Sequence, residues 1–138
     1  MPVAEVAGRM LDTYPREFQL DRDLLVSCIE ACSDCAESCT QCADDCLAEE
    51  TVQDLTTCIR RCLDCADVCV ATGRVVSRQT GYDAEVTAAV LRACIETCRR
   101  CAEECEIHAA HAMEHCRVCG EECRRCERAC TELLASIA

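Results

Sequence analysis

Several residue types are rare or absent in this sequence. It contains no tryptophan and no lysine, and aromatic residues make up only 2% of its 138 residues. Turn signals are few, with 4 glycines and 2 prolines, and nowhere do β-branched residues alternate with polar ones as strands require. No stretch approaches the about 18 apolar residues of a membrane span. These absences predict an all-α protein, and the length predicts a single domain over residues 1–138.

The amino-terminal segment does not resemble a signal peptide. Residues 1–18 have no apolar run of signal-peptide length, because Glu5, Arg9 and Asp12 interrupt them. We therefore expect a cytoplasmic protein. The formal net charge of −12 disfavours nucleic acid and anionic membranes as partners, since both are themselves negatively charged.

Cysteine, by contrast, is present in great excess, with 19 residues. Such a share normally marks a small secreted disulfide scaffold. The number is odd, however, so complete pairing within one chain is impossible. In a reducing compartment, thiols more often bind metal or carry out redox chemistry.

Capping signals divide the chain into one short helix and four long ones. Asp21 and Asp83 are candidate N-caps, 51–54 resembles a capping box, and Gly81 can end a helix with positive φ. Short connections between long helices predict an up-down antiparallel four-helix bundle with a short extra N-terminal helix. The expected helices cover 3–13, 21–48, 51–79, 83–109 and 112–136.

The third connection of the bundle carries no glycine or proline. One unbroken helix from Asp83 to the carboxyl end is the alternative. A turn near 108–112 is favoured, because an uncapped helix beyond about 25 residues is unusual outside coiled coils, membrane spans and helical repeats.

The cysteines follow one stripe of each long helix, separated by alternating steps of three and four residues. This spacing places them where leucine and isoleucine lie in an ordinary bundle. Charged residues such as Asp44 and Arg99 fall on the other faces. The four groups are Cys28, Cys32, Cys35, Cys39, Cys42 and Cys46; Cys58, Cys62, Cys65 and Cys69; Cys94, Cys98, Cys101 and Cys105; and Cys116, Cys119, Cys123, Cys126 and Cys130.

Folding the helices about their turns arranges these cysteines in layers. Each layer takes one thiol from every helix, and beyond the layers the stripes become aliphatic. The predicted layers are Cys42, Cys58, Cys105 and Cys116; Cys39, Cys62, Cys101 and Cys119; Cys35, Cys65, Cys98 and Cys123; and Cys32, Cys69, Cys94 and Cys126. The predicted aliphatic end gathers Leu24, Leu25, Val76, Val86, Val90, Leu91, Leu133 and Leu134.

Cysteine can serve simply as a small buried hydrophobe. A whole core of them would leave cavities, at about 24 cal/mol per Å3, unless something fills the space. Metal ions bound to thiolates would do so. Cu(I) is soft and singly charged, so roughly one Cu(I) per cysteine leaves the core near neutral. Zn(II), which would give four-thiolate sites of charge −2, remains the alternative.

Repeated blocks such as Cys32-Ser-Asp-Cys35-Ala-Glu-Ser-Cys39 resemble those of the bacterial copper storage proteins, in their cytosolic branch. The resemblance covers the chain from Asp21 to its end. It implies a four-helix bundle, many Cu(I) ions in the core, and a homotetramer. It also suggests a copper chaperone as the donor.

The same resemblance implies that histidines lie at an open end where copper passes. His108, His111 and His115, with Met113, cluster at the expected third turn. As soft or borderline ligands they would pass Cu(I) inward. The alternative is that three surface histidines merely lie near a loop.

Storage requires no catalytic constellation, so an enzyme is not expected. A chaperone needs only one two-cysteine site, and a DNA-binding sensor would carry a basic patch. A redox enzyme would need one thiol of lowered pKa beside a basic group. Broad soft-metal detoxification, in the manner of a metallothionein, uses the same sulfur chemistry and stays open as the alternative function.

Overall fold

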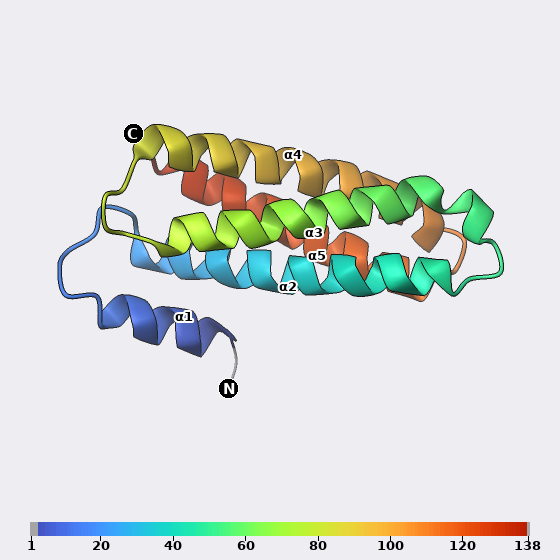
Figure 1. Cartoon of the computed structure of the whole chain (residues 1–138), viewed down its shortest axis with the longest axis horizontal. Helices are drawn as coiled ribbons and strands as arrows, with labels where there is room; N and C mark the ends of the chain where they lie inside the picture. The colour runs from blue at the N-terminus through green and yellow to red at the C-terminus, as the bar shows by residue number, and fades with distance from the viewer. Residues whose placement is uncertain (1–2, 138) are drawn as a thin grey trace.

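The computed structural model describes residues 3–137, and within them the chain forms helices and no strand. Four long helices lie side by side, with successive helices antiparallel, and the short N-terminal helix lies along one of them (Figure 1). Each long helix packs against the helices before and after it, and α5 closes the ring against α2. The predicted all-α bundle is confirmed. The helices are α1 (Val3–Asp12), α2 (Arg22–Leu47), α3 (Thr56–Ser77), α4 (Ala84–Ala109) and α5 (Glu114–Ala135), with a 3-10 turn η1 (Val52–Asp54) before α3.

Two of the predicted N-caps are present. The Asp21 carboxylate accepts a hydrogen bond of 3.0 Å from the backbone N–H of Leu24 at the start of α2. The Asp83 carboxylate accepts bonds of 3.0 and 3.1 Å from Glu85 and Val86 at the start of α4. These caps satisfy backbone donors that have no partner inside their helices.

The capping box predicted at 51–54 is wrong. Thr51 makes no capping hydrogen bond through its side chain, and α3 begins only at Thr56. The intervening Leu55 is 1% exposed. Burying this leucine at the end of the bundle is worth about 1.5–3 kcal/mol, more than a cap, so the chain turns through η1 first. At its other end α3 stops at Ser77, and Gly81, with φ +70°, lies in the following turn.

The turn predicted between α4 and α5 is confirmed. Ala112 adopts a positive φ of 66°, which ends α4 without glycine. The N–H of Met113 donates to the carbonyl of His108 at 3.3 Å, and the N–H of Ala112 donates to that of Ala109 at 3.1 Å. These two bonds are the pair that defines a Schellman motif.

Helix α1 is tied to α2 by one bidentate ion pair. The Arg22 guanidinium donates to both carboxylate oxygens of Asp12, at 2.5 and 2.9 Å. The Arg22 side chain passes over Gly8, and a Cβ added at Gly8 would lie only 2.8 Å from the guanidinium. Neither α1 nor any other helix among residues 3–137 combines the length and apolarity that a membrane crossing needs.

The end of the bundle near the amino termini of α2 and α4 is aliphatic, as predicted, with two exceptions on α4. Leu25, Leu91 and Leu133 are fully buried there. Val86, however, is 51% exposed, and Val90 is only half-buried and is not among the residues that pack against the core. The buried stripe of α4 runs back from Leu91 by three and four residues, which selects Ala88 and Thr87 and leaves Val86 one position outside it.

Candidate metal centre

The four cysteine stripes all point into the bundle. Every cysteine is a free thiol, and none is more than 2% exposed. The steps of three and four residues keep each stripe on the buried face of its helix, as in coiled-coil packing. Small residues help the backbones approach, since a Cβ at Gly120 of α5 would lie 3.5 Å from the Cβ of Cys105 in α4.

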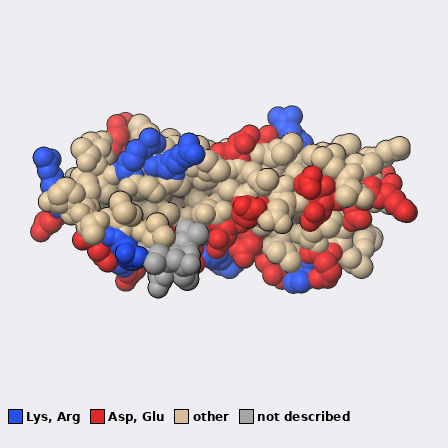
Figure 2. Space-filling model, turned by 60° about the horizontal axis from the view of Figure 1, so that its bottom comes forward, with Lys and Arg blue, Asp and Glu red and all other residues tan. Residues whose placement is uncertain are grey.

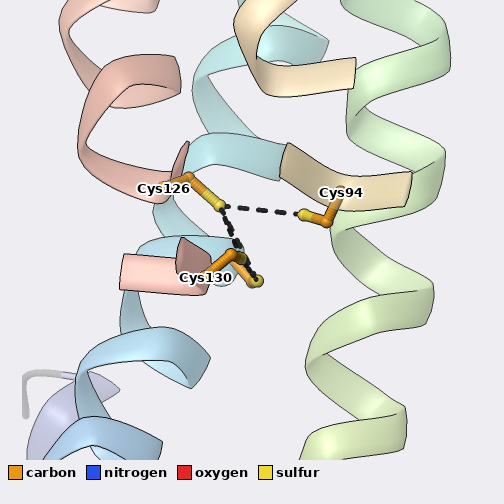
Figure 3. A group of neighbouring side chains, drawn as sticks. Cys94, Cys126 and Cys130 are labelled. Carbon is orange, nitrogen blue, oxygen red and sulfur yellow. Dashed lines mark hydrogen bonds between the residues drawn. The ribbon is translucent and has the colours of Figure 1, made fainter. Parts of the chain in front are cut away.

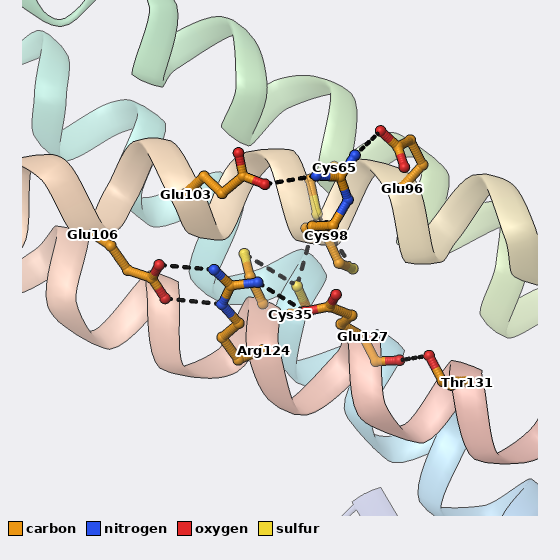
Figure 4. Close-up of polar contacts among 11 residues, drawn as sticks. Cys35, Cys65, Glu96, Cys98, Glu103, Glu106, Arg124, Glu127 and Thr131 are labelled. Carbon is orange, nitrogen blue, oxygen red and sulfur yellow. Dashed lines mark hydrogen bonds and ion pairs between the residues drawn. The ribbon is translucent and has the colours of Figure 1, made fainter.

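The predicted layers are observed as contacts between helices. In one layer, the Cys35 sulfur lies 3.9 Å from that of Cys65 and 3.7 Å from that of Cys123. Cys65 in turn lies 3.7 Å from Cys98, so a single layer joins all four helices. Part of this layer is visible behind the surface ion pairs in Figure 4.

Neighbouring layers are also in contact, so the sulfurs form one continuous column. Figure 3 shows Cys126 between Cys94 and Cys130, each 4.0 Å from it. Cys130 then reaches Cys28, at 3.8 Å, at the aliphatic end. At the opposite end Cys46 contacts Cys58 at 4.0 Å.

The sulfur spacing matches that of sulfurs around a shared metal ion. With a metal–sulfur bond of about 2.3 Å, two ligands lie about 3.8 Å apart in a tetrahedral site and about 4.0 Å apart in a trigonal one. Four-sulfur groups whose atoms all lie within 4.8 Å of one another recur along the column, such as Cys39, Cys101, Cys119 and Cys123. Contacts between helices are as short as those within one, so the geometry favours ions shared across helices as well as along them.

The thiols of this column influence one another's protonation. Hydrogen bonds from Cys130 and Cys32 lower the pKa of Cys28 to about 5. The pKa of Cys32 is raised instead, chiefly by its contact with Cys126. Burial raises the pKa of Cys46. Such a cluster titrates as a set, and a buried thiolate in it needs a neighbouring proton or a cation.

His115 is the histidine that the structure joins to the thiols. Its Nδ1 lies 3.4 Å from the sulfur of Cys42 and 3.6 Å from that of Cys116. Its Nε2 lies 3.1 Å from a carboxylate oxygen of Glu49. The thiols of Cys42, Cys46 and Cys116 and the His115 imidazole lie close enough together to hold one metal ion.

The other predicted residues at this end differ from His115. His108 bonds to Glu104 at 2.8 Å, one turn back on α4, and His111 is exposed in the turn. Among residues 3–137, neither makes a hydrogen bond to a thiol, and Met113 packs as an apolar side chain against the core. The sequence groups them with His115 because they are close in the chain and because the family resemblance implies histidines at this end.

Two residues beside the thiols and His115 were not predicted from the sequence. Glu49, just after the end of the neighbouring helix α2, orients His115 at the start of α5, although 66 residues separate them. Ser38 donates to the carbonyl of Cys35 and lies 4.0 Å from the sulfur of Cys119. Ser38 directly precedes Cys39 of the stripe, so the sequence offered a signal that its hydroxyl lies near the thiols. Nothing in the sequence pairs Glu49 with His115.

Arginines on the outside tie α5 to both its neighbours. Arg124 forms a bidentate pair with Glu106 of α4, at 2.8 and 2.9 Å, and also bonds Glu127 (Figure 4). Arg125 reaches Asp34 and Glu30 of α2. Exposed pairs of this kind contribute about 0–1 kcal/mol each, so they set the register of α5 more than the stability.

Comparison with known proteins identifies this arrangement. The profile of the copper storage protein family matches residues 21–135, which include all four long helices and all 19 cysteines. The chain belongs to the copper storage protein family. No curated protein matches the chain.

Solved structures of one family member are closely similar. The copper storage protein Ccsp from Streptomyces lividans, loaded with 10 copper equivalents, is 56% identical, with a TM-score of 0.92 over 94% of this chain and 98% of that chain. A histidine-to-alanine mutant of Ccsp is 59% identical, with a TM-score of 0.84 over 86% of this chain and 98% of that one. A structure of the same cytosolic protein with five coppers is 59% identical, with a TM-score of 0.82 over 84% and 96%.

Proposed function

We propose that this protein is a cytosolic store for Cu(I), which its core thiols bind as many ions per chain. The observation that carries this proposal is the continuous column of buried, unpaired thiols, with neighbouring sulfurs 3.7–4.0 Å apart from one end to the other. A column of this length exceeds what one transfer site, one sensor site or one catalytic thiol pair requires. The relative loaded with 10 copper equivalents supports multiple ions in one core.

Charge decides how such a core can be filled. Each thiol that binds metal first loses its proton, so loading releases protons and places negative charge in a buried column. One Cu(I) per thiolate cancels that charge, whereas tetrahedral zinc sites would each leave −2 behind. We propose all 19 cysteines as Cu(I) ligands, with roughly one ion per cysteine as the upper capacity.

His115 is the proposed first imidazole on the copper's way into the core. Its Nδ1 faces Cys42 and Cys116, and Glu49 holds the other ring nitrogen. A carboxylate behind a ligating histidine fixes the ring and its tautomer, as in many metal sites. His108, His111 and Met113 keep a subsidiary role in this proposal, because they lie on the turn beside the site.

The remaining parts of the proposal rest on the family. Storage implies binding and release without turnover, so no catalytic role is proposed. A homotetramer and delivery by a copper chaperone follow from the resemblance to cytosolic copper storage proteins. The net charge of −12 is the reason that nucleic acid and anionic membranes are not proposed as partners.

A competitive metal titration tests the function. The fully reduced, oxygen-free protein is titrated with Cu(I) in the presence of a chromogenic Cu(I) chelator, and again with Zn(II). We expect roughly one Cu(I) per cysteine to bind before the chelator responds, with far weaker zinc uptake. Saturation at one or two Cu(I), or a preference for four or five Zn(II), would contradict storage.

A further inference from the structure

One group of close metal ligands differs in composition from the rest of the column. Several groups along the column consist of four thiols, whereas this one contains three thiols and an imidazole. We call it the mixed group. It comprises Cys42 and Cys46 of α2 with His115 and Cys116 of α5. Three cysteines and one histidine are a recurrent closed ligand set of structural zinc sites.

The distances within the mixed group fit a tetrahedral divalent ion. The Nδ1 of His115 lies 3.4 Å from the sulfur of Cys42 and 3.6 Å from that of Cys116, and these two sulfurs are 3.8 Å apart. With Zn–S bonds of about 2.3 Å and a Zn–N bond of about 2.0–2.1 Å, tetrahedral angles place two sulfurs about 3.8 Å apart and a sulfur and a nitrogen about 3.6 Å apart. The sulfur of Cys46 lies within 4.8 Å of the other three ligand atoms, so it completes the set.

Glu49 prepares the imidazole of this group for a metal ion. Its carboxylate oxygen lies 3.1 Å from the Nε2 of His115. A carboxylate can only accept a hydrogen bond, so Nε2 carries the hydrogen and Nδ1 presents its lone pair to the thiols. The same order of carboxylate, histidine and metal supports many zinc sites, where loss of the carboxylate lowers metal affinity about 10–100-fold.

Charge also separates the mixed group from the groups of four thiols. Zn(II) with three thiolates and a neutral imidazole has a net charge of −1, whereas four thiolates leave −2. The His115 side chain is 21% exposed, whereas thiols in the middle of the column, such as Cys98, are fully buried. Because a net charge costs more to hold away from water, a divalent ion is accommodated more easily in the mixed group than deeper in the column.

The surface around this end of the bundle attracts divalent cations. Figure 2 shows red carboxylates spread over the half of the molecule that carries the turns after α2 and α4. The last turn of α2 has no basic residue, and the exposed Asp44 and Asp45 directly precede Cys46. Since electrostatic attraction grows in proportion to charge, this surface concentrates a divalent ion more than a monovalent one.

We propose that the copper-free protein binds one Zn(II) in the mixed group, and that this ion joins α2 to α5 until Cu(I) replaces it. The inference rests on the proposed storage function, because it concerns the empty state of the store. Binding releases the protons of the three thiols, and the later replacement is an exchange of ligands without electron transfer. Cu(I) prevails because thiolates are soft ligands. The zinc fastens the end of the bundle opposite Leu25, Leu91 and Leu133.

Titration with Co(II) tests the site, because Co(II) takes up the tetrahedral sites of Zn(II) and absorbs visible light. The reduced, oxygen-free and metal-free protein is titrated, and the d–d and thiolate-to-Co(II) charge-transfer bands are followed. We expect one tight equivalent with the band intensity of a tetrahedral site. One equivalent of Zn(II) should remove the bands and raise the thermal midpoint of the protein, and excess Cu(I) should also remove them.

Two variants with matched controls assign the ligands. His115→Ala should abolish the tight equivalent, whereas His108→Ala, at a histidine that bonds Glu104 and no thiol, should keep it. Glu49→Ala leaves all four ligands in place, so it should lower the Co(II) affinity about 10–100-fold with nearly unchanged band positions. Glu50→Ala, at the exposed next residue, should bind as the wild type does.

The outcomes separate the zinc site from storage. Absence of a tight equivalent, or one that His115→Ala and Glu49→Ala leave unchanged, would overturn the zinc site, and a capacity near one Cu(I) per cysteine would then leave storage standing. Uptake of four or five Co(II) with equal affinity would place divalent ions throughout the column and would also overturn a site confined to the mixed group. Failure of the wild-type protein to bind many Cu(I) ions would overturn the proposed function itself, whether or not Co(II) binds.

Discussion

The two ends of the bundle fill equivalent buried stripes with different side chains. At the end beyond Cys28 and Cys130, Leu25, Leu91 and Leu133 pack as in an ordinary helical core. Over the rest of the length the same stripe positions hold thiols, 3.7–4.0 Å from one another. Both regions exclude solvent to the same degree, but the leucines bury more apolar area per side chain than the cysteines do.

The comparison shows how one bundle can use different regions for the stability of the apo protein and for metal binding. Leucine stabilises the apo protein by about 1.5–3 kcal/mol for each side chain buried. A cysteine buries less apolar area and offers a ligand instead. The aliphatic end is therefore expected to hold the empty protein together, and the thiol region to become the more stable part when copper binds.

Copper loading should change the stability of the thiol region more than any substitution does. A ligand at about 1,000 times its Kd stabilises the folded state by about 4 kcal/mol per site, so a few Cu(I) ions add as much as the about 5–15 kcal/mol of a typical domain. We expect the thermal midpoint, followed by far-UV circular dichroism, to rise steeply with loading. Removal of copper by a strong chelator should restore the apo value. Equal midpoints for loaded and empty protein would contradict the idea.

Substitutions in the two regions should then separate stability from capacity. Leu91→Ala should lower the free energy of unfolding of the apo protein by about 2–5 kcal/mol and leave Cu(I) capacity unchanged. Cys98→Ala should cost only about 1 kcal/mol but remove about one ion. Urea unfolding and copper titration measure the two quantities. Leu91→Met, which keeps the volume, is the control, with a loss below about 1.5 kcal/mol. Loss of capacity in Leu91→Ala would mean that the two ends are not independent.

The thiol end has its own contrast, between histidines that touch sulfur and those that do not. His115→Ala should slow loading by about tenfold, equivalent to about 1.4 kcal/mol in the barrier, with at most one ion lost from the final capacity. His111→Ala, at an exposed position in the turn and without a hydrogen bond to a thiol, is the comparison and should slow loading much less, in keeping with its subsidiary role. Stopped-flow loading followed by titration of the same samples gives both values. Equal slowing by the two substitutions would assign the effect to the surface near the turn and not to the imidazole beside Cys42.

The sequence predicted the thiol column well because its evidence is periodic. Alternating steps of three and four residues fix which face of a helix is buried, and nearly every neighbour of Cys35 or Cys126 follows from them. Predictions failed where one local signal competed with packing. Thr51 looked like a cap, but burial of Leu55 decided where α3 begins. The contact between Glu49 and His115 depends on two turns meeting in space, which no local pattern encodes.

The smallest expected change in the free energy of unfolding is at the turn between α4 and α5, at the thiol end of the bundle. Ala112 has a φ of 66°, a conformation that costs a residue with a Cβ about 1–2 kcal/mol, whereas glycine adopts it freely. Ala112→Gly removes that cost but loosens the unfolded chain, which leaves a net gain of about 0.5–1 kcal/mol in urea unfolding of the apo protein.

Two positions in the same turn make this prediction discriminating. Ala110 has an ordinary φ of −64°, so Ala110→Gly gains nothing in the folded state and should lose about 0.5–1 kcal/mol. Opposite signs at two alanines only two residues apart would show that backbone strain at Ala112, and not glycine content, sets the result. Because neither substitution touches a thiol or His115, copper capacity should stay constant in both. Destabilisation by Ala112→Gly would mean that its methyl group packs usefully in the turn and outweighs the strain.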